Sequence, residues 1–254
     1  MSMLKPLPRK RNLTWLWPLA GGLSLLLLWS GIIVLGEVRP FIAPAPWDVA
    51  AEIWKNRVLL AQNFWPTLLE AVAGFICGNL AAISVAVIFV HFHTVQKMYL
   101  PIAVLFNTIP VIALAPILIL IFGINITPKI IIASLVCFFP TLVNMIRGLE
   151  AYTSSEMELM RVMSASRLEI FLRLRLPRSL PFLFSALRIS CTSCVIGAIV
   201  GEWIGSTMGI GSLIIQATFN YRSGLLYAAI CMSSALALSL FTIVIASEKK
   251  FLRW

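Results

Sequence analysis

The stretch EAYTSSEMELMRVMSASRLEIFLRLRLPRSLP, residues 150–181, separates two long apolar blocks and is the only long charge-rich, amphipathic segment between them. Glutamates and arginines alternate in it with methionine, leucine and phenylalanine, which is typical of short helices with one apolar face. The chain on both sides of it is suited to a bilayer. We therefore predict a membrane protein whose main polar element, this segment, lies outside the bilayer.

Two helix starts are predicted inside this segment. Ser155 followed by Glu158, and Ser166 followed by Glu169, match the S-x-x-E capping box, in which the two side chains satisfy free N–H groups at a helix N-terminus. The first helix is expected over residues 155–163.

Each of the two helices has an apolar stripe, and Pro177 is expected to end the second helix because proline lacks a backbone N–H. An amphipathic hairpin that lies on lipid headgroups remains an alternative interpretation of the segment. The stripes consist of Met157, Met160 and Met163 in the first helix and Leu168, Phe171 and Leu174 in the second.

The composition places the rest of the chain in a membrane. Hydrophobic residues make up 60% of the 254 residues, charged residues 12%, and the mean hydropathy is +0.95. The apolar runs are long and uninterrupted, which favours helices over the alternating strands of a barrel. We predict an all-α, polytopic fold with a tail over residues 1–14 and a single transmembrane domain over residues 15–254. The net charge of +10 shows no basic stripe with interleaved aromatics, so we expect no nucleic-acid partner.

Six transmembrane spans are predicted, because each apolar run is long enough to cross a hydrocarbon core of roughly 30 Å. A loop over residues 36–63 is expected to contain a short interfacial helix at 47–60. The spans cover residues 15–35, 66–90, 99–122, 130–146, 182–204 and 225–246.

The distribution of Lys and Arg predicts the orientation. With the N-terminus inside, fourteen of the 20 basic residues face the cytoplasm, five face outwards, and Arg188 lies within a span. Positive charge is retained on the cytoplasmic side of membrane proteins. We therefore predict that both termini and the 150–181 segment are cytoplasmic.

Residues 107–116, NTIPVIALAP, are a candidate lining of a translocation pathway. Prolines inside a membrane helix free carbonyl groups that need partners or a cavity. We select Asn107, Pro110 and Pro116 for this role; a kinked but fully packed helix is the alternative.

Ionisable residues inside spans are costly in lipid and are therefore functional candidates. Glu70, Arg188 and Glu202 are the candidates here, and we add them to the predicted pathway. Arg188 is alternatively expected to reach the cytoplasmic interface with its long side chain. Glu202 is predicted to act in a gate or an inter-helix contact, with a structural carboxylate as the alternative.

Gly197, Gly201 and Gly205 recur every four residues, which gives a smooth face for helix packing. Cys191 and Cys194 lie in an apolar run, and we expect neither a disulfide nor a metal site from them.

The charged segment resembles the EAA loop of ABC importer permeases, whose pattern is E-A-A, three residues, G, and an I-x-L-P ending. Here Leu159 and Met160 replace the two alanines and Ser164 replaces the glycine. The resemblance implies that the first helix is a coupling helix that docks into a separate ATPase. The residues assigned to this coupling are Ser155, Glu158, Leu159, Met160, Ser164, Ala165, Ser166, Arg167, Leu176 and Pro177.

The resemblance extends from about residue 64 to the C-terminus. The runs NTIP, LAP, FFP, GEW and GIG are similar to those of nitrate, sulfonate and taurine permeases, and of permeases for pyrimidine precursors of thiamine and for riboflavin. It implies a type I ABC importer permease fold in a bacterial inner membrane, working as a homodimer with a periplasmic or lipid-anchored solute-binding protein. The solute would be a small organic anion or a pyrimidine vitamin precursor.

The chain has no G-x-x-x-x-G-K-[ST] motif, so we expect ATP and Mg²⁺ to bind to the partner ATPase and no cofactor to bind here. An ion-coupled secondary transporter is the alternative, although no inverted repeat or midplane carboxylate pair is evident. A membrane-bound enzyme is disfavoured, because no catalytic or metal-spaced cluster appears in the spans.

Overall fold

The computed structural model describes residues 16–252 and is helical throughout, with no strand in that range. The predicted tail over residues 1–14 lies outside the described residues. The elements are α1 (Leu16–Leu35), α2 (Pro46–Lys55), α3 (Arg57–His91), α4 (His93–Thr108), α5 (Val111–Phe122), α6 (Ile126–Leu149), α7 (Ser154–Val162), α8 (Arg167–Ile170), a π-helical turn η2 (Phe171–Arg175), α9 (Leu176–Glu202), α10 (Ile210–Phe219) and α11 (Ser223–Phe251).

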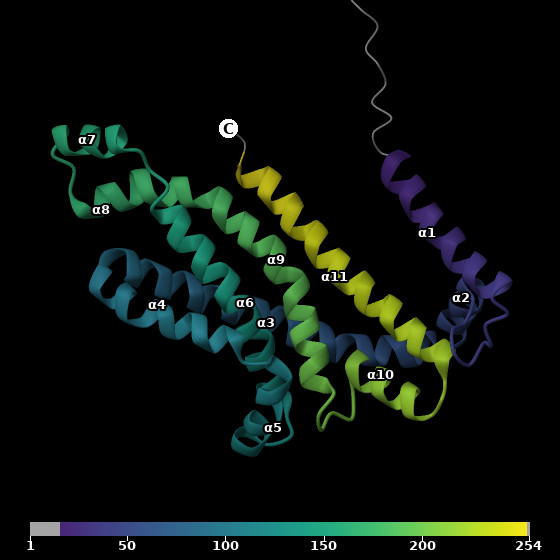
Figure 1. The fold of residues 1–254 in the computed structure, drawn as a ribbon. Coiled ribbons are helices and arrows are strands. Elements are labelled where there is room, and N and C mark those ends of the chain that lie inside the picture. The colour runs from purple at the N-terminus through teal and green to yellow at the C-terminus, as the bar shows by residue number, and fades with distance from the viewer. Residues whose placement is uncertain (1–15, 253–254) are drawn as a thin grey trace, which may run out of the picture.

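Helices α3, α6 and α9 form the centre of the fold, since α6 packs along both of the others. Helix α11 runs beside α9, and α10 packs between α9, α11 and α3 (Figure 1). Helices α1 and α2 lie towards one end of the molecule, and α7 and α8 lie at the opposite end (Figure 1). The all-α polytopic fold class predicted from the sequence is confirmed.

Close approach of the three central helices depends on glycine. A Cβ at Gly74 would lie 2.3 Å from Ala133 Cβ, and one at Gly197 would lie 2.8 Å from Ala133 Cα. Gly201 similarly faces Lys129 Cα at 3.0 Å. The glycine faces of α3 and α9 therefore pack closely against the same stretch of α6, as small residues do between membrane helices. The third member of the predicted stripe, Gly205, does not belong to it, because α9 ends at Glu202 and Gly205 lies in the following turn with φ +74°.

A buried polar network joins the same three helices near their middle. Thr141 Oγ1 of α6 donates to Asn79 Oδ1 of α3 at 2.6 Å and lies 3.0 Å from Ser190 Oγ of α9. Interhelical hydrogen bonds of this kind hold helices together where lipid gives no hydrophobic driving force between them.

Two predicted spans differ from the structure. Residues 99–122 are not one helix but α4 and α5, which meet at 97°. Ile109 is extended there (φ −70°, ψ 125°), because the residue before a proline avoids helical backbone and Pro110 donates no N–H. Helix α3 begins at Arg57, not at residue 66. The helix predicted over residues 47–60 corresponds to α2, which ends at Lys55, so the last residues of that prediction belong to α3.

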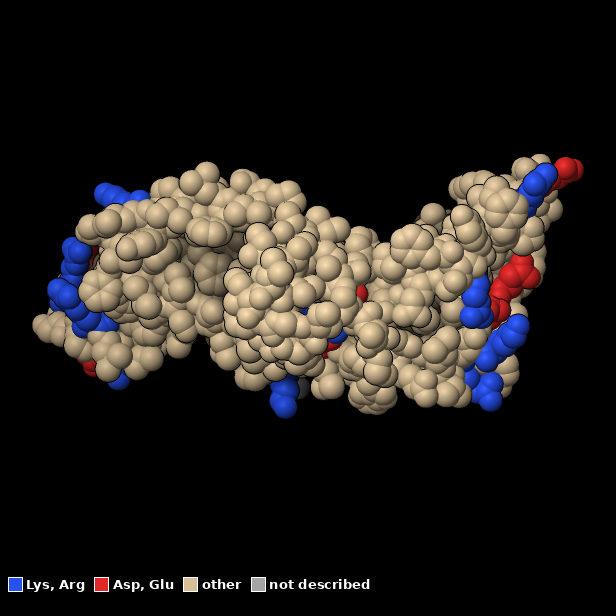
Figure 2. All heavy atoms as spheres, turned by 90° about the horizontal axis from the view of Figure 1, so that it is seen from below, with Lys and Arg blue, Asp and Glu red and all other residues tan. Residues whose placement is uncertain are grey.

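The number of spans is smaller by length and composition than the six predicted. Among residues 16–252, four helices are long and apolar enough to cross a membrane, and the bent pair α4 and α5 would make a fifth. Helix α1 is apolar as well, but its stretch Leu19–Leu35 belongs to the shorter apolar helices and is not among these four. Figure 2 shows most charged side chains gathered towards the two ends of the long dimension, with few charged side chains between them.

Candidate functional site

The predicted coupling segment forms a pair of short helices, α7 and α8, at one end of the molecule (Figure 1). No residue of α7 is buried, and its apolar side chains Leu159 and Val162 are 60% and 82% exposed. Glu158 is exposed as well. The segment therefore presents a mixed apolar and charged surface.

The start of α7 differs from the prediction. The capping box is formed by Thr153 and Glu156, with Glu156 N donating to Thr153 Oγ1 at 3.2 Å and Thr153 N donating to Glu156 Oε2 at 2.8 Å. The prediction of Ser155 with Glu158 was wrong because the run Thr153, Ser154, Ser155 offers several N-cap residues, and only the first has extended backbone.

The predicted second capping box, Ser166 with Glu169, is confirmed. Ser166 N donates to Glu169 Oε2 at 2.8 Å, and Glu169 N donates to Ser166 Oγ at 3.3 Å. Ser166 Oγ also donates to Glu169 Oε2 at 2.9 Å. The hydrogen bonds from the backbone N–H and the hydroxyl of Ser166 hold the pKa of the Glu169 carboxyl below its ordinary value.

The turn between α7 and α8 explains the glycine of the EAA pattern. Ser164 occupies that position and has left-handed backbone, with φ +53°. Ala165 N donates to Met160 O at 3.0 Å and Ser164 N donates to Arg161 O at 2.9 Å. These two bonds form the Schellman motif, in which glycine is preferred because it has no Cβ. Serine therefore keeps the turn at a conformational cost.

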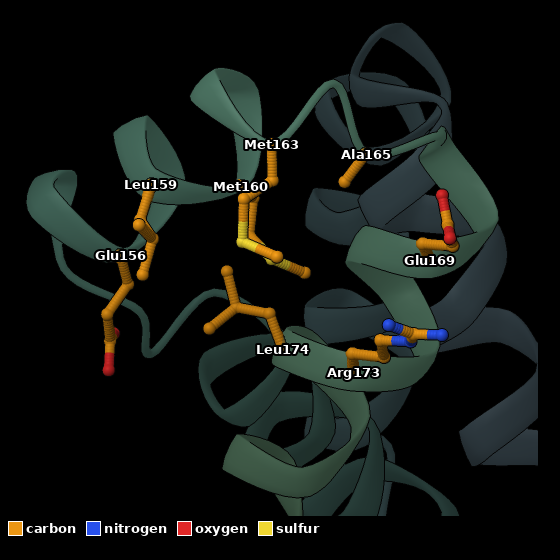
Figure 3. Close-up of a pocket in the computed structure, with 8 residues that line it drawn as sticks. All are labelled: Glu156, Leu159, Met160, Met163, Ala165, Glu169, Arg173 and Leu174. Carbon is orange, nitrogen blue, oxygen red and sulfur yellow. The ribbon is translucent and has the colours of Figure 1, made fainter.

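A hollow of about 200 Å³ lies between α7 and the segment that leads to α9. Figure 3 shows the side chains of Met160 and Met163 pointing into this space towards Leu174, with Glu169 and Arg173 on its other side. Leu174 is 9% exposed. Flexible methionines thus make up much of the contact between α7 and the rest of the chain.

Pro177 does not end the second helix, contrary to the prediction. The chain passes from α8 through η2 into α9, and Arg167–Glu202 forms one helical stretch of 36 residues. Pro177 lies in the first turn of α9, and the preceding π-helical turn is closed by Leu176 N donating to Phe171 O. In a π-turn the backbone hydrogen bonds run from residue i to i−5 instead of i−4, and in the first turn of a helix the missing N–H of proline is tolerated.

Polar contacts that sequence reasoning missed attach the segment to the bundle. Arg178 of α9 pairs with Glu156 of α7. Arg175 lies 5.2 Å over the ring of Tyr152, with Nη2 3.4 Å from its hydroxyl, and Nη1 lies 3.5 Å from Val90 O at the end of α3. The T-x-x-E spacing of residues 153–156 is itself a capping-box pattern, and it could have identified Glu156 from the sequence.

The predicted pathway residues do not form one group. Asn107, Pro110 and Pro116 lie on exposed faces around the bend between α4 and α5. Arg188 pairs with Glu248 of α11 at 3.3 Å, so it has a partner in the bundle in addition to its partial exposure.

Glu70 and Glu202 lie in a buried polar cluster between α3, α6 and α9. Lys129 Nζ of α6 donates to Glu70 Oε1 at 2.9 Å and to Ser206 Oγ at 2.8 Å. Glu70 Oε2 is buried without a hydrogen-bond partner among the described residues.

Glu202 holds the loop that connects α9 to α10. Its Oε1 accepts from Thr67 Oγ1 at 2.6 Å and its Oε2 accepts from Gly211 N at 2.5 Å. The same face of α3 holds the start of α10, because Ile210 N donates to Thr67 Oγ1 and Gly209 N donates to Asn63 Oδ1, both at 2.8 Å. Glu202 thus makes the predicted inter-helix contact, and its two satisfied oxygens also fit the alternative of a structural carboxylate. A part in gating stays a prediction.

Long apolar helices, a broken helix and a polar helix pair beyond the bundle define a multi-pass, all-helical membrane protein. The chain belongs to the family "binding-protein-dependent transport system inner membrane component", the permeases of ABC importers, which matches residues 78–253. This is a transport family and not an enzyme family.

Relatives and a solved structure agree with this assignment. The chain is 34% identical over 217 residues to a probable ABC transporter permease protein of Haemophilus influenzae, covering 85% of this chain and 89% of that one. It is 29% identical to the riboflavin transport system permease protein RibX of Chloroflexus aurantiacus, covering 97% and 95%. A structure of the inward-facing MetNI methionine ABC transporter has the same fold, with a TM-score of 0.69 at 19% identity over 77% of this chain and 97% of that one.

Proposed function

We propose that this chain is the membrane subunit of an importer that carries a small polar solute into a bacterial cell, driven by ATP hydrolysis on a separate ATPase. The observation that carries the proposal is the exposed helix pair α7 and α8, whose chain continues without a break into α9. A docked partner that moves α7 would act directly on a helix that crosses the bundle.

The surface of α7 is suited to a protein partner. Leu159 and Val162 are 60% and 82% exposed, next to exposed glutamate and arginine side chains. Apolar groups with a charged rim are typical of protein interfaces. We assign this surface to the ATPase, which binds ATP and Mg²⁺, and place it in the cytoplasm together with both termini. The basic residues at this end, among them Arg161, Arg167 and Arg173, support that orientation.

The pathway is assigned to the interface between two copies of the chain. The bend between α4 and α5 leaves Leu120 and Ile121 86% and 66% exposed, and Asn107 lies on the same broken element. Non-helical backbone at membrane depth needs either protein or a water-filled cavity beside it. A second copy that faces this element would supply both.

For the solute we propose a small polar organic molecule, with heterocyclic vitamin-related compounds ahead of organic anions. The RibX relative carries riboflavin in its name, which supports this order. The charged groups in the bundle, Glu70, Lys129, Arg188 and Glu202, have partners within the chain. An external solute-binding protein would therefore make most of the selection.

The test is purification of the tagged chain from its native membrane, followed by reconstitution with the proteins that accompany it. We expect an ATPase with a phosphate-binding loop to co-purify, and solute uptake to require ATP hydrolysis. Uptake that continues without ATP and collapses with an ionophore would refute the proposal in favour of an ion-coupled transporter.

A further inference from the structure

Helix α7 is attached to the rest of the protein by few contacts. It has no buried residue, and its methionines face Leu174 on one side and the end of α3 and η2 on the other. Among the described residues its one ion pair joins Glu156 to Arg178. Methionine side chains adapt to displaced neighbours, so they transmit a small movement poorly. The ion pair between Glu156 and Arg178 is therefore the contact through which a small displacement of α7 passes to α9.

Glu156 connects two elements with one carboxylate. Its Oε2 closes the N-terminal cap of α7 by accepting from Thr153 N at 2.8 Å, and its Oε1 accepts from Arg178 of α9. A movement of the start of α7 therefore pulls directly on the first turns of α9. Arg178 belongs to the same 36-residue helical stretch that ends at Glu202.

We infer that Glu156 and Arg178 are the positioning pair through which displacement of α7 reaches α9, and hence the transport pathway. The inference rests on the proposed function, because it requires a partner that moves α7. It assigns the link to Glu156, not to Glu158, which is exposed on the same helix.

The two side chains are partly exposed, at 26% and 50%. Ion pairs at such positions contribute little to folding stability. Loss of the pair is therefore expected to leave folding and assembly intact and to change the ratio between solute transport and ATP hydrolysis.

The structure offers a matched control. Glu156 and Glu169 each occupy the third position of a capping box, and glutamine at that position still closes such a box. Glu156→Gln removes the charge that pairs with another helix, whereas Glu169→Gln removes a charge whose capping partner, Ser166, belongs to its own helix.

The experiment measures solute molecules imported per ATP hydrolysed in proteoliposomes that hold the complete complex. We expect this ratio to fall about 2- to 5-fold in Glu156→Gln and in Arg178→Gln, the range that a pair of this exposure supports, and to stay unchanged in Glu169→Gln. Equal ratios in Glu156→Gln and Glu169→Gln would overturn the inference.

A charge exchange separates the pair from the cap. Glu156→Arg loses both, and adding Arg178→Glu restores only the pair, so a higher ratio in the double variant than in Glu156→Arg supports the inference and an equal ratio overturns it. Failure of the proposed function has a different signature: the wild-type complex would show no ATP-dependent import, whereas failure of the inference alone leaves the wild type coupled.

Discussion

Replacement of Gly209 by alanine should release the loop between α9 and α10. Gly209 has φ +119°, and a Cβ there would lie 2.1 Å from Oε1 and 2.2 Å from Cδ of Glu202. The Glu202 side chain is 1% exposed and is held by Thr67 Oγ1 and Gly211 N. The alanine therefore displaces the carboxylate from Thr67 Oγ1 and Gly211 N.

The magnitude has two parts. Backbone strain of a non-glycine residue in this region costs about 1–3 kcal/mol. The Gly211 N–H, now without an acceptor, costs about 1–3 kcal/mol more. Thr67 keeps an alternative acceptor, since its hydroxyl also lies 3.2 Å from Asn63 O. The sum is about 2–6 kcal/mol, most of it local to the loop.

Gly205→Ala is the matched control. Gly205 also has positive φ, at +74°, but the nearest heavy atom to an added Cβ is 3.6 Å away. The control therefore pays only the backbone cost of about 1–2 kcal/mol. The two alanines should differ by about 2 kcal/mol, which corresponds to roughly 30-fold in a local opening equilibrium.

The assay is hydrogen exchange with mass spectrometry on peptides that cover residues 203–212, in detergent or nanodiscs. We expect the amide of Gly211 to exchange roughly 30-fold faster in Gly209→Ala than in Gly205→Ala. Equal exchange in the two variants would show that Glu202 does not hold this loop.

Three further outcomes follow from single contacts. Thr141→Val removes the hydroxyl between Asn79 and Ser190 and should lower the free energy of unfolding by about 1–2 kcal/mol, measured by thermal unfolding in detergent. The control is Thr242→Val, because Thr242 is exposed and its hydroxyl bonds only within its own helix, so stability should not change. Ser164→Gly relieves a left-handed serine and should stabilise the turn after α7 by up to about 1 kcal/mol, seen as slower amide exchange there. The Glu169 cap has a lowered pKa, so its stabilisation is present above the ordinary pKa of 4.5 and is lost as the pH falls through the lowered value. Ser166→Ala keeps the backbone donor and removes the hydroxyl donor, so a carboxyl NMR titration should show the pKa raised only part of the way, and an unchanged pKa would show that the hydroxyl contributes nothing.

The sequence was sufficient for features that depend on local periodicity. Long apolar runs predicted the helices that became α6, α9 and α11, and the Ser166 capping box was found because its partners are three residues apart. Glycine spacing predicted a packing face, and Gly197 and Gly201 lie against α6.

The remaining features depend on partners far away in the chain. Several prolines, such as Pro66, Pro101 and Pro140, lie inside helices, whereas the helix breaks at Pro110, the one proline between residues 57 and 252 that lies outside a helix. Tertiary packing decides where the missing hydrogen bond is tolerated. The role of Glu202 depends on Thr67, which is 135 residues away, and no local pattern announces such a contact.

Helices α3 and α9 are tied together at both of their facing ends. At the end near α7, Arg175 reaches Val90 O, the backbone acceptor in the last turn of α3. At the other end Glu202 accepts from Thr67 of the same helix.

Between these two ties, both helices pack on α6 through glycine faces. A push on α7 that reaches Arg178 therefore acts on α3 and α9 as one body, because neither helix can shift without breaking a contact at each end. The broken element follows α3 after Phe92, and within it α4 and α5 meet at the extended residue Ile109 with a bend of 97°. Hinge movements are absorbed by a few residues at the ends of rigid elements, so we expect relative movement of α4 and α5 at this bend.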